Sequence, residues 1–168
     1  SKFLSDYGRK KYDLDIRTGF LNKVCSEFNQ EYDFISFWDV LEHIYDINQE
    51  LDNALKLLKK NGYLIINVPL IGTLPEKLLG NRWPMYLDVH IHFFTKKSLL
   101  YLLLNKNMEL VKDFSYWQTL PLPYILKRGL GFLGFNKLAE FFYKNIPTID
   151  IAYYIGQRCF VFKRKNEK

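Results

Sequence analysis

Cysteine is scarce in this chain, and the scarcity excludes several classes of protein. The 168 residues include two cysteines, Cys25 and Cys159, which are too few for a disulfide scaffold and are not spaced as a CxxC metal site. They fit a reducing cytoplasm, and we expect both side chains to serve in packing. Long apolar runs are also missing. The longest, Leu99–Leu104, falls far short of the roughly 18 residues that a membrane-spanning helix needs.

A start methionine and a signal-like segment are missing as well. The sequence begins at Ser1, and no basic stretch followed by an apolar stretch comes after it. We therefore expect either a fragment of a longer cytoplasmic protein or a processed product.

No strong patch of one charge sign is present. The net charge is +6, but lysine and arginine are spread along the chain, and four of the 24 lie in the last six residues. Such dispersed basicity does not predict a nucleic-acid partner. Hydrophobic residues at 48% and aromatic residues at 17% instead predict a sizeable core, and the length suits one domain.

The clearest pattern is a strand, a helix and a second strand. Tyr32–Val40 is apolar at nearly every position, which is typical of a strand covered on both faces. Asp46, with Gln49 three residues on, predicts a helix start, and apolar residues then recur at helical spacing. Asn61–Gly62 predicts a left-handed helix end, and Tyr63–Pro69 reads as a buried strand. This order predicts parallel strands joined by a right-handed crossover.

Shorter elements surround this unit. Residues 3–12 are typical of a helix with Phe3, Leu4 and Tyr7 facing inward, and Leu14–Gly19 reads as a short strand. A leucine-rich helix begins after Thr95.

Two closing strands are predicted near the C-terminus, within 108–117 and 152–165. We interpret residues 117–150 as an inserted, partly helical cap. Residues 1–168 are then a single, incomplete α/β domain.

Candidate chemistry gathers after the first strand of the central unit. In open α/β sheets, ligands bind beyond the carboxyl ends of the strands, and "FWDVLEHI" places Asp39, Glu42 and His43 there within five residues. His43 is suited to act as a general base near neutral pH. The two carboxylates and the imidazole would alternatively hold a divalent cation. The structural alternative is that Asp39 caps a turn while Glu42 and His43 brace the loop.

Two segments resemble the class I S-adenosylmethionine-dependent methyltransferases, in particular the small-molecule and glycan-type group with "DVLEH" after strand four. Residues 32–69 are similar to strand four, its loop, helix D and strand five, with Lys60 and Asn61 in place of the usual Pro and Gly before Gly62. A second stretch matches that group's "W…H-x-x-x-F-S-x-x-S-L" pattern. It does so through Trp83, His90, Phe94, Thr95 and Ser98. The resemblance covers about residues 1–116.

The family's glycine-rich cofactor loop and the acidic residue after its strand two have no counterpart here. The glycines of "RGLGFLGF" (128–135) lie in the inserted cap and do not follow a first strand. The resemblance places Ser1 just after strand two. It therefore implies a partial Rossmann-like fold that lacks strands one and two, with a mostly parallel sheet and a C-terminal antiparallel strand. We expect this chain alone to be inactive, whether it is a truncated record or a natural short protein.

The resemblance also implies roles for individual residues. Two segments would bind S-adenosylmethionine: Gly19, Phe20 and Leu21 against the adenine, and Phe37, Trp38 and Asp39 beneath the methionine and reaction centre. His43, with Asp39, would be catalytic, His43 as general base. For Phe20 and Trp38 a packing role is the alternative.

Some relatives, among them ubiquinone-type O-methyltransferases and small-RNA 2′-O-methyltransferases, bind Mg²⁺ through a similar pattern plus a later histidine. The residues here that resemble this set are Asp39, Glu42, His43 and His90. We nevertheless expect no resident metal and keep Mg²⁺ as the alternative.

The sequence thus predicts a methyltransferase that acts on a hydroxyl or amine of a small-molecule, glycan or lipid-linked acceptor. The alternative is a non-catalytic partner-binding module that keeps the fold without the cofactor; no obligate protein partner is predicted. We expect the cap to be a lid packed on its own domain; the alternative is that it rests peripherally on an anionic membrane, for which it is amphipathic enough. Its apolar residues are Phe132, Leu133, Phe135, Leu138, Phe141 and Phe142, and its basic residues are Lys127, Arg128, Lys137 and Lys144.

Overall fold

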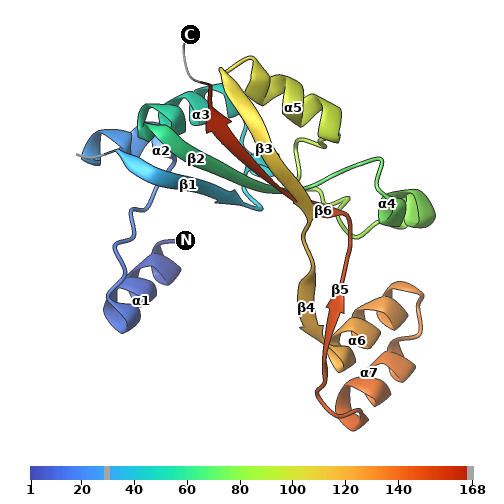
Figure 1. Cartoon of the computed structure of the whole chain (residues 1–168). Coiled ribbons are helices and arrows are strands. Elements are labelled where there is room, and N and C mark those ends of the chain that lie inside the picture. The colour runs from blue at the N-terminus through green and yellow to red at the C-terminus, as the bar shows by residue number, and fades with distance from the viewer. Residues whose placement is uncertain (29–30, 166–168) are drawn as a thin grey trace.

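A four-stranded sheet forms the centre of the protein (Figure 1). The computed structural model describes residues 1–28 and 31–165. In spatial order the strands are β1 (Tyr32–Trp38), β2 (Leu58–Pro69), β6 (Gln157–Arg164) and β3 (Met108–Ser115). β1 and β2 pair in parallel, whereas β6 is antiparallel to both β2 and β3. β1, β2 and β3 therefore share one direction and β6 runs against them, which confirms the predicted sheet.

The helix α3 (Ile47–Lys56) connects β1 to β2 and confirms the predicted strand–helix–strand unit. Its start is also confirmed, because the Asp46 side chain accepts a hydrogen bond of 2.9 Å from the backbone N–H of Gln49. Leu51 and Ala54 are fully buried on its inner face.

The predicted end of this helix is wrong. α3 stops at Lys56, and Asn61–Gly62 lies within β2. Strand pairing prevails over the turn preference, because Leu58 already pairs with Tyr32 at the start of β1. Gly62 is required by a close approach: a Cβ there would lie 3.0 Å from the carbonyl oxygen of Asp33.

One face of the sheet carries the core. The helix α5 (Lys96–Leu104) begins at the predicted Thr95, which forms a reciprocal capping box with Ser98. Its Leu99 and Leu103 join the inner side chains of α3 and the strands in one buried cluster that includes Phe160.

The opposite face of the sheet is largely uncovered, so the prediction that β1 is buried on both faces is wrong. The side chain of Phe34 is 64% exposed and that of Trp38 is 47% exposed. Phe34 stacks on Tyr63 of the neighbouring strand at a ring-centroid distance of 5.7 Å. No described helix packs over these rings, which leaves an aromatic surface beside the free edge of β1.

The N-terminal segment departs from prediction in two ways. The helix α1 (Lys2–Tyr12) forms, but its residues Phe3, Leu4 and Tyr7 are exposed, because α1 lies away from the sheet (Figure 1). Leu14–Gly19 is not a strand. A strand needs a hydrogen-bonded neighbour, and the part of the chain that the structure describes supplies none at this segment.

A protruding arm interrupts the path from β3 to β6 (Figure 1). It comprises β4 (Gln118–Pro121), α6 (Leu122–Phe132), α7 (Asn136–Asn145) and β5 (Asp150–Tyr153). β4 and β5 form an antiparallel ribbon that carries the two helices. Helical structure within residues 117–150 is therefore present as expected, whereas its role as a cap stays a prediction. Over the described residues, every helix is too short or too polar to traverse a bilayer.

Short helical turns complete the fold. They are α2 (Leu21–Val24), η1 (Cys25–Glu27), η2 (Leu41–His43), α4 (Leu74–Leu79) and η3 (Gly80–Arg82). The turn η2 follows β1 directly, and its Leu41 is fully buried in the core. This anchor fixes the loop that carries the candidate site.

We expect Asp46→Ala to lower the free energy of unfolding by about 1 kcal/mol, because it removes the side chain that caps α3. Urea denaturation would measure the change, with Asn48→Ala on the same exposed turn as the matched control. Equal stability of the two variants would contradict the capping role.

Candidate functional site

Asp39 lies at the carboxyl end of β1, in a left-handed backbone conformation with φ of 51°. This region is uncommon for residues other than glycine. The backbone N–H of Asp39 donates to the carbonyl of Asn67 on β2 at 3.1 Å, which ties the turn to the sheet. The turn thus places a carboxylate at the edge of the sheet where ligands of such folds bind.

Two amide side chains hold this carboxylate. The Oδ1 atom of Asp39 accepts hydrogen bonds from Gln157 Nε2 at 2.6 Å and from Asn67 Nδ2 at 3.1 Å. Both amides are buried. Burial raises the pKa of Asp39, while the hydrogen bond from Gln157, the nearby His90 and the hydrogen bond from Asn67 act in the opposite direction.

Neither amide was predicted from the sequence. Asn67 carried a signal, because it is the lone polar side chain within the apolar strand segment "YLIINVP". Gln157 carried none, because only the pairing of β2 with β6, which sets Pro69 opposite Gln157, brings it to this edge.

A chain of hydrogen bonds continues from Asp39 into the arm. Gln118 of β4 donates through Nε2 to Gln157 Oε1, and Tyr153 of β5 donates through its hydroxyl to Gln118 Oε1. Burial raises the pKa of the Tyr153 hydroxyl. The base of the arm is therefore fixed to the same carboxylate as the sheet.

Glu42, His43 and His90 form a second cluster beside Asp39. One potential ligand atom from each lies within 4.8 Å of the others, and the two imidazole rings meet edge to face at 4.7 Å between centroids. The backbone carbonyl of Glu42 accepts from the N–H groups of Ile91 and His92, at 2.9 and 3.1 Å, and so joins the two loops. The predicted candidates Glu42, His43 and His90 are thus brought together.

The hydrogen bonds of the two histidines indicate their tautomers. His43 Nδ1 lies 2.9 Å from the carbonyl oxygen of Val89, and His90 Nδ1 lies 2.8 Å from that of Met85. Since a carbonyl only accepts, Nδ1 carries the proton in each neutral ring and Nε2 keeps a lone pair. Burial, together with the adjacent His43, lowers the pKa of His90 and favours this neutral form.

The donor set of this cluster fits a metal ion. The side chain of Glu42 is 1% exposed, and its Oε2 atom has no hydrogen-bond partner among the described residues. Burial and the neighbouring Asp39 both raise the pKa of Glu42. A buried carboxylate and two imidazole lone pairs are all acceptors, which is the arrangement that cations require. Asp39 differs from this set, since its Oδ1 atom already accepts two amide hydrogen bonds.

Most of the second sequence motif is structural. Trp83 is buried, and its indole N–H donates to the carbonyl of Ile155 at 2.6 Å. Phe94 lies in the core, and Thr95 with Ser98 caps α5. Of this motif, His90 alone contributes a side chain to the cluster described above.

The predicted cofactor residues lie at the same edge but differ in exposure. The backbone N–H of Leu21 donates to Glu50 in the first turn of α3 at 3.0 Å, which places the Gly19–Leu21 loop beside that helix. Phe20 is 60% exposed, and Trp38 leans on Tyr116 with much of its ring free. Phe37 is buried in the core, so its side chain is withdrawn from any ligand.

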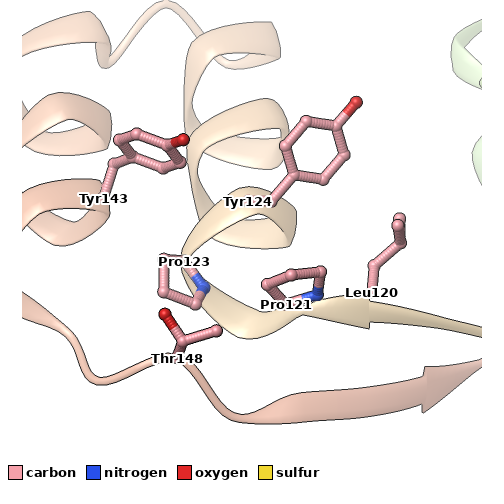
Figure 2. A pocket seen from close by; sticks show the side chains of 6 residues that line it. All are labelled: Leu120, Pro121, Pro123, Tyr124, Tyr143 and Thr148. Carbon is pink, nitrogen blue, oxygen red and sulfur yellow. The ribbon is translucent and has the colours of Figure 1, made fainter.

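A hollow of about 430 Å³ lies elsewhere, where the β4–β5 ribbon meets α6 and α7 (Figure 2). It is lined by Leu120, Pro121, Pro123, Tyr124, Tyr143 and Thr148. It contains neither Asp39 nor the histidine cluster, so it is not the site that the sequence predicted.

Comparison with known proteins identifies the family. The sequence model of the methyltransferase-domain family matches residues 5–113, whereas no curated protein sequence matches the chain. Among solved structures, an S-adenosylmethionine-dependent methyltransferase of Thermotoga maritima superposes with a TM-score of 0.58 at 16% identity, over 98% of this chain and 70% of that one. YcgJ of Bacillus subtilis gives 0.57 at 12%, over 98% and 78%.

TehB of Haemophilus influenzae superposes with a TM-score of 0.51 at 14% identity, over 95% of this chain. The chain spans 45% of the length of TehB. At such identities these likenesses show the fold, and the family match rests on the sequence model, which covers more than half of the chain. The chain belongs to the methyltransferase-domain family.

Proposed function

We propose that the chain contributes the acceptor side and part of the cofactor side of an S-adenosylmethionine-dependent methyltransferase. Family membership and the exposed carboxyl edge of β1 support the proposal. Asp39 carries it most directly, because a carboxylate held by two buried amides at this edge is a fixed anchor for a ligand. If the chain is instead a non-catalytic binding module, we expect it not to bind the cofactor.

The cofactor would contact exposed surfaces on either side of Asp39. Phe20 and Trp38 offer aromatic faces to the adenine and to the region of the methionine, and the loop of Gly19 and Leu21 offers backbone groups. Residues 1–168 include no glycine-rich turn after a first strand. We therefore propose that this chain alone binds the cofactor weakly and turns over little.

His43 would receive the proton of the acceptor. It is exposed and its Nε2 lone pair is free, because Nδ1 is engaged with the Val89 carbonyl. The bound cofactor would supply the methyl group, with the carbon–sulfur electron pair left on sulfur, and the proton lost by the acceptor oxygen or nitrogen would pass to Nε2 of His43. Positioning supplies most of the acceleration, since the leaving group is already activated by its charge.

Replacing His43 should separate chemistry from binding. In the full protein encoded by the reading frame, we expect His43→Ala to lower methyl transfer from labelled S-adenosylmethionine by about 10²-fold or more. Its affinity for the cofactor should change by less than about twofold, since His43 faces the acceptor. Tyr45→Ala is the matched control, because Tyr45 lies two residues further along the same loop and its side chain is 92% exposed. Loss of affinity with unchanged turnover would remove His43 from the catalytic role.

A metal-assisted form is the second candidate, and the acceptor-only cluster favours it. Glu42, His43 and His90 would hold the ion, which would then supply Lewis acidity toward an acceptor hydroxyl in place of the free imidazole. Two imidazoles with one carboxylate suit Zn²⁺, Co²⁺ or Fe²⁺ better than Mg²⁺, which prefers oxygen ligands.

Metal titration tests this second candidate. If the cluster is a metal site, Co²⁺ should bind with a visible absorption band, and His90→Ala should weaken binding by at least about tenfold. Tyr45→Ala, which changes an exposed side chain on the same loop, should leave binding unchanged. Equal affinities of these two variants, or binding of Mg²⁺ in preference to Co²⁺, would contradict a metal site at Glu42, His43 and His90.

A further inference from the structure

The two helices of the arm carry an excess of positive charge. Residues 122–145 contain four basic side chains, Lys127, Arg128, Lys137 and Lys144, against one acidic side chain, Glu140. Glu140 pairs with Lys127 at 2.6 Å. Among the ion pairs that join described residues, no other involves these helices, and four basic against one acidic side chain leave them a net charge of +3.

Large apolar side chains are exposed beside these charges. Around the turn from α6 to α7, Leu133 and Phe135 are each 57% exposed, and along α7 Leu138 is 44% and Phe141 is 58% exposed. Phe135, Leu138 and Phe141 recur every three residues and so line one side of α7. Phe132, one of the six apolar residues predicted for this region, has a side chain that the structure does not describe.

The basic residues flank the same side of the helix. Lys137 precedes Phe141 by four residues and Lys144 follows it by three, and both spacings bring side chains together on a helix surface. A row of apolar side chains bordered by lysines is the pattern of helices that lie in the interface of an anionic membrane.

The arm does not bury this surface against its own domain. α6 and α7 pack chiefly on each other, with Ala139 buried between them, and the pair projects away from the sheet (Figure 1). The exposed apolar side chains of the arm do not pack on the sheet, while the role of residues 117–150 as a cap stays a prediction.

We propose that the tip of the arm, made by Leu133, Phe135, Leu138 and Phe141 with Lys137 and Lys144, docks on an anionic lipid surface. The apolar side chains enter the boundary between headgroups and acyl chains, and the lysines meet lipid phosphates. We choose an anionic bilayer as the partner because the net positive charge of the arm complements it. The inference does not depend on methyl transfer. A docked arm would nevertheless hold Asp39 near a lipid-linked acceptor, because the Gln118–Gln157 hydrogen bond ties the arm to the residue that bonds Asp39.

Flotation with vesicles tests the docking. The full chain should float with vesicles that mix phosphatidylglycerol and phosphatidylcholine, float poorly with phosphatidylcholine alone, and detach as salt is raised. Phe135→Ser/Phe141→Ser should lower the bound fraction by about tenfold or more, since it removes two inserted rings. Lys137→Glu/Lys144→Glu should abolish the preference for anionic lipid.

The matched control is Tyr45→Ser/Leu78→Ser, which removes two exposed apolar side chains outside the arm. It should float as the unmodified chain does, and circular dichroism should show that every variant keeps its helices. Absence of flotation with anionic vesicles, equal flotation with phosphatidylcholine alone, or an equal loss in the control would overturn the proposal.

Discussion

Two buried amides donate hydrogen bonds to one carboxylate, and the arrangement of the strands, the site loop and the arm depends on these bonds. Asn67 on β2 and Gln157 on β6 both donate to Asp39 at the end of β1, so three neighbouring strands are joined at the edge where a ligand would bind. Partial burial raises the pKa of this carboxylate, yet Asp39 remains exposed, so the two amides hold it where a ligand can reach it. The turn η2 follows from the same point, so the position of Glu42 and His43 depends on it. The base of the arm is fixed to it as well, through Gln118 and Tyr153.

Over the described residues the two faces of the sheet are covered unequally. α3 and α5 bury one face with leucine side chains, whereas the face that carries Phe34 and Trp38 and the outer edge of β1 stay open. An open strand edge is a ready site for further pairing. The arm exposes apolar groups too, but it combines them with unpaired positive charge, which the open face of β1 does not. These two surfaces therefore differ in the partners that their chemistry favours.

Much of this fold was predictable because the relevant signals are local. The capping of α3 by Asp46, the start of α5 at Thr95 and the parallel pairing of β1 with β2 all follow from residue type and spacing, and the structure confirms each. Where the sequence misled, tertiary pairing was the cause. β2 extends back through Asn61–Gly62 because β1 is there to pair with, and Leu14–Gly19 stays outside the sheet because none of the described strands adjoins it.

The candidate site residues show the same difference between local signals, which the sequence carries, and tertiary contacts, which it does not. The sequence motifs identified Asp39, Glu42, His43 and His90 as candidates. Only the folded structure shows that Asp39 is hydrogen-bonded by two amides, whereas the other three side chains lie together in one cluster. Gln157 and Gln118 were beyond prediction, because the pairing of distant strands sets their place. The most direct test of the account is a titration of the isotope-labelled chain with S-adenosylmethionine, followed by NMR, in which even millimolar binding shifts the resonances it touches. The account predicts shifts at the Trp38 indole and the backbone amides of Leu21 and Asp39. Shifts confined to the hollow beside Tyr124 and Tyr143, or none at several millimolar cofactor, would contradict it.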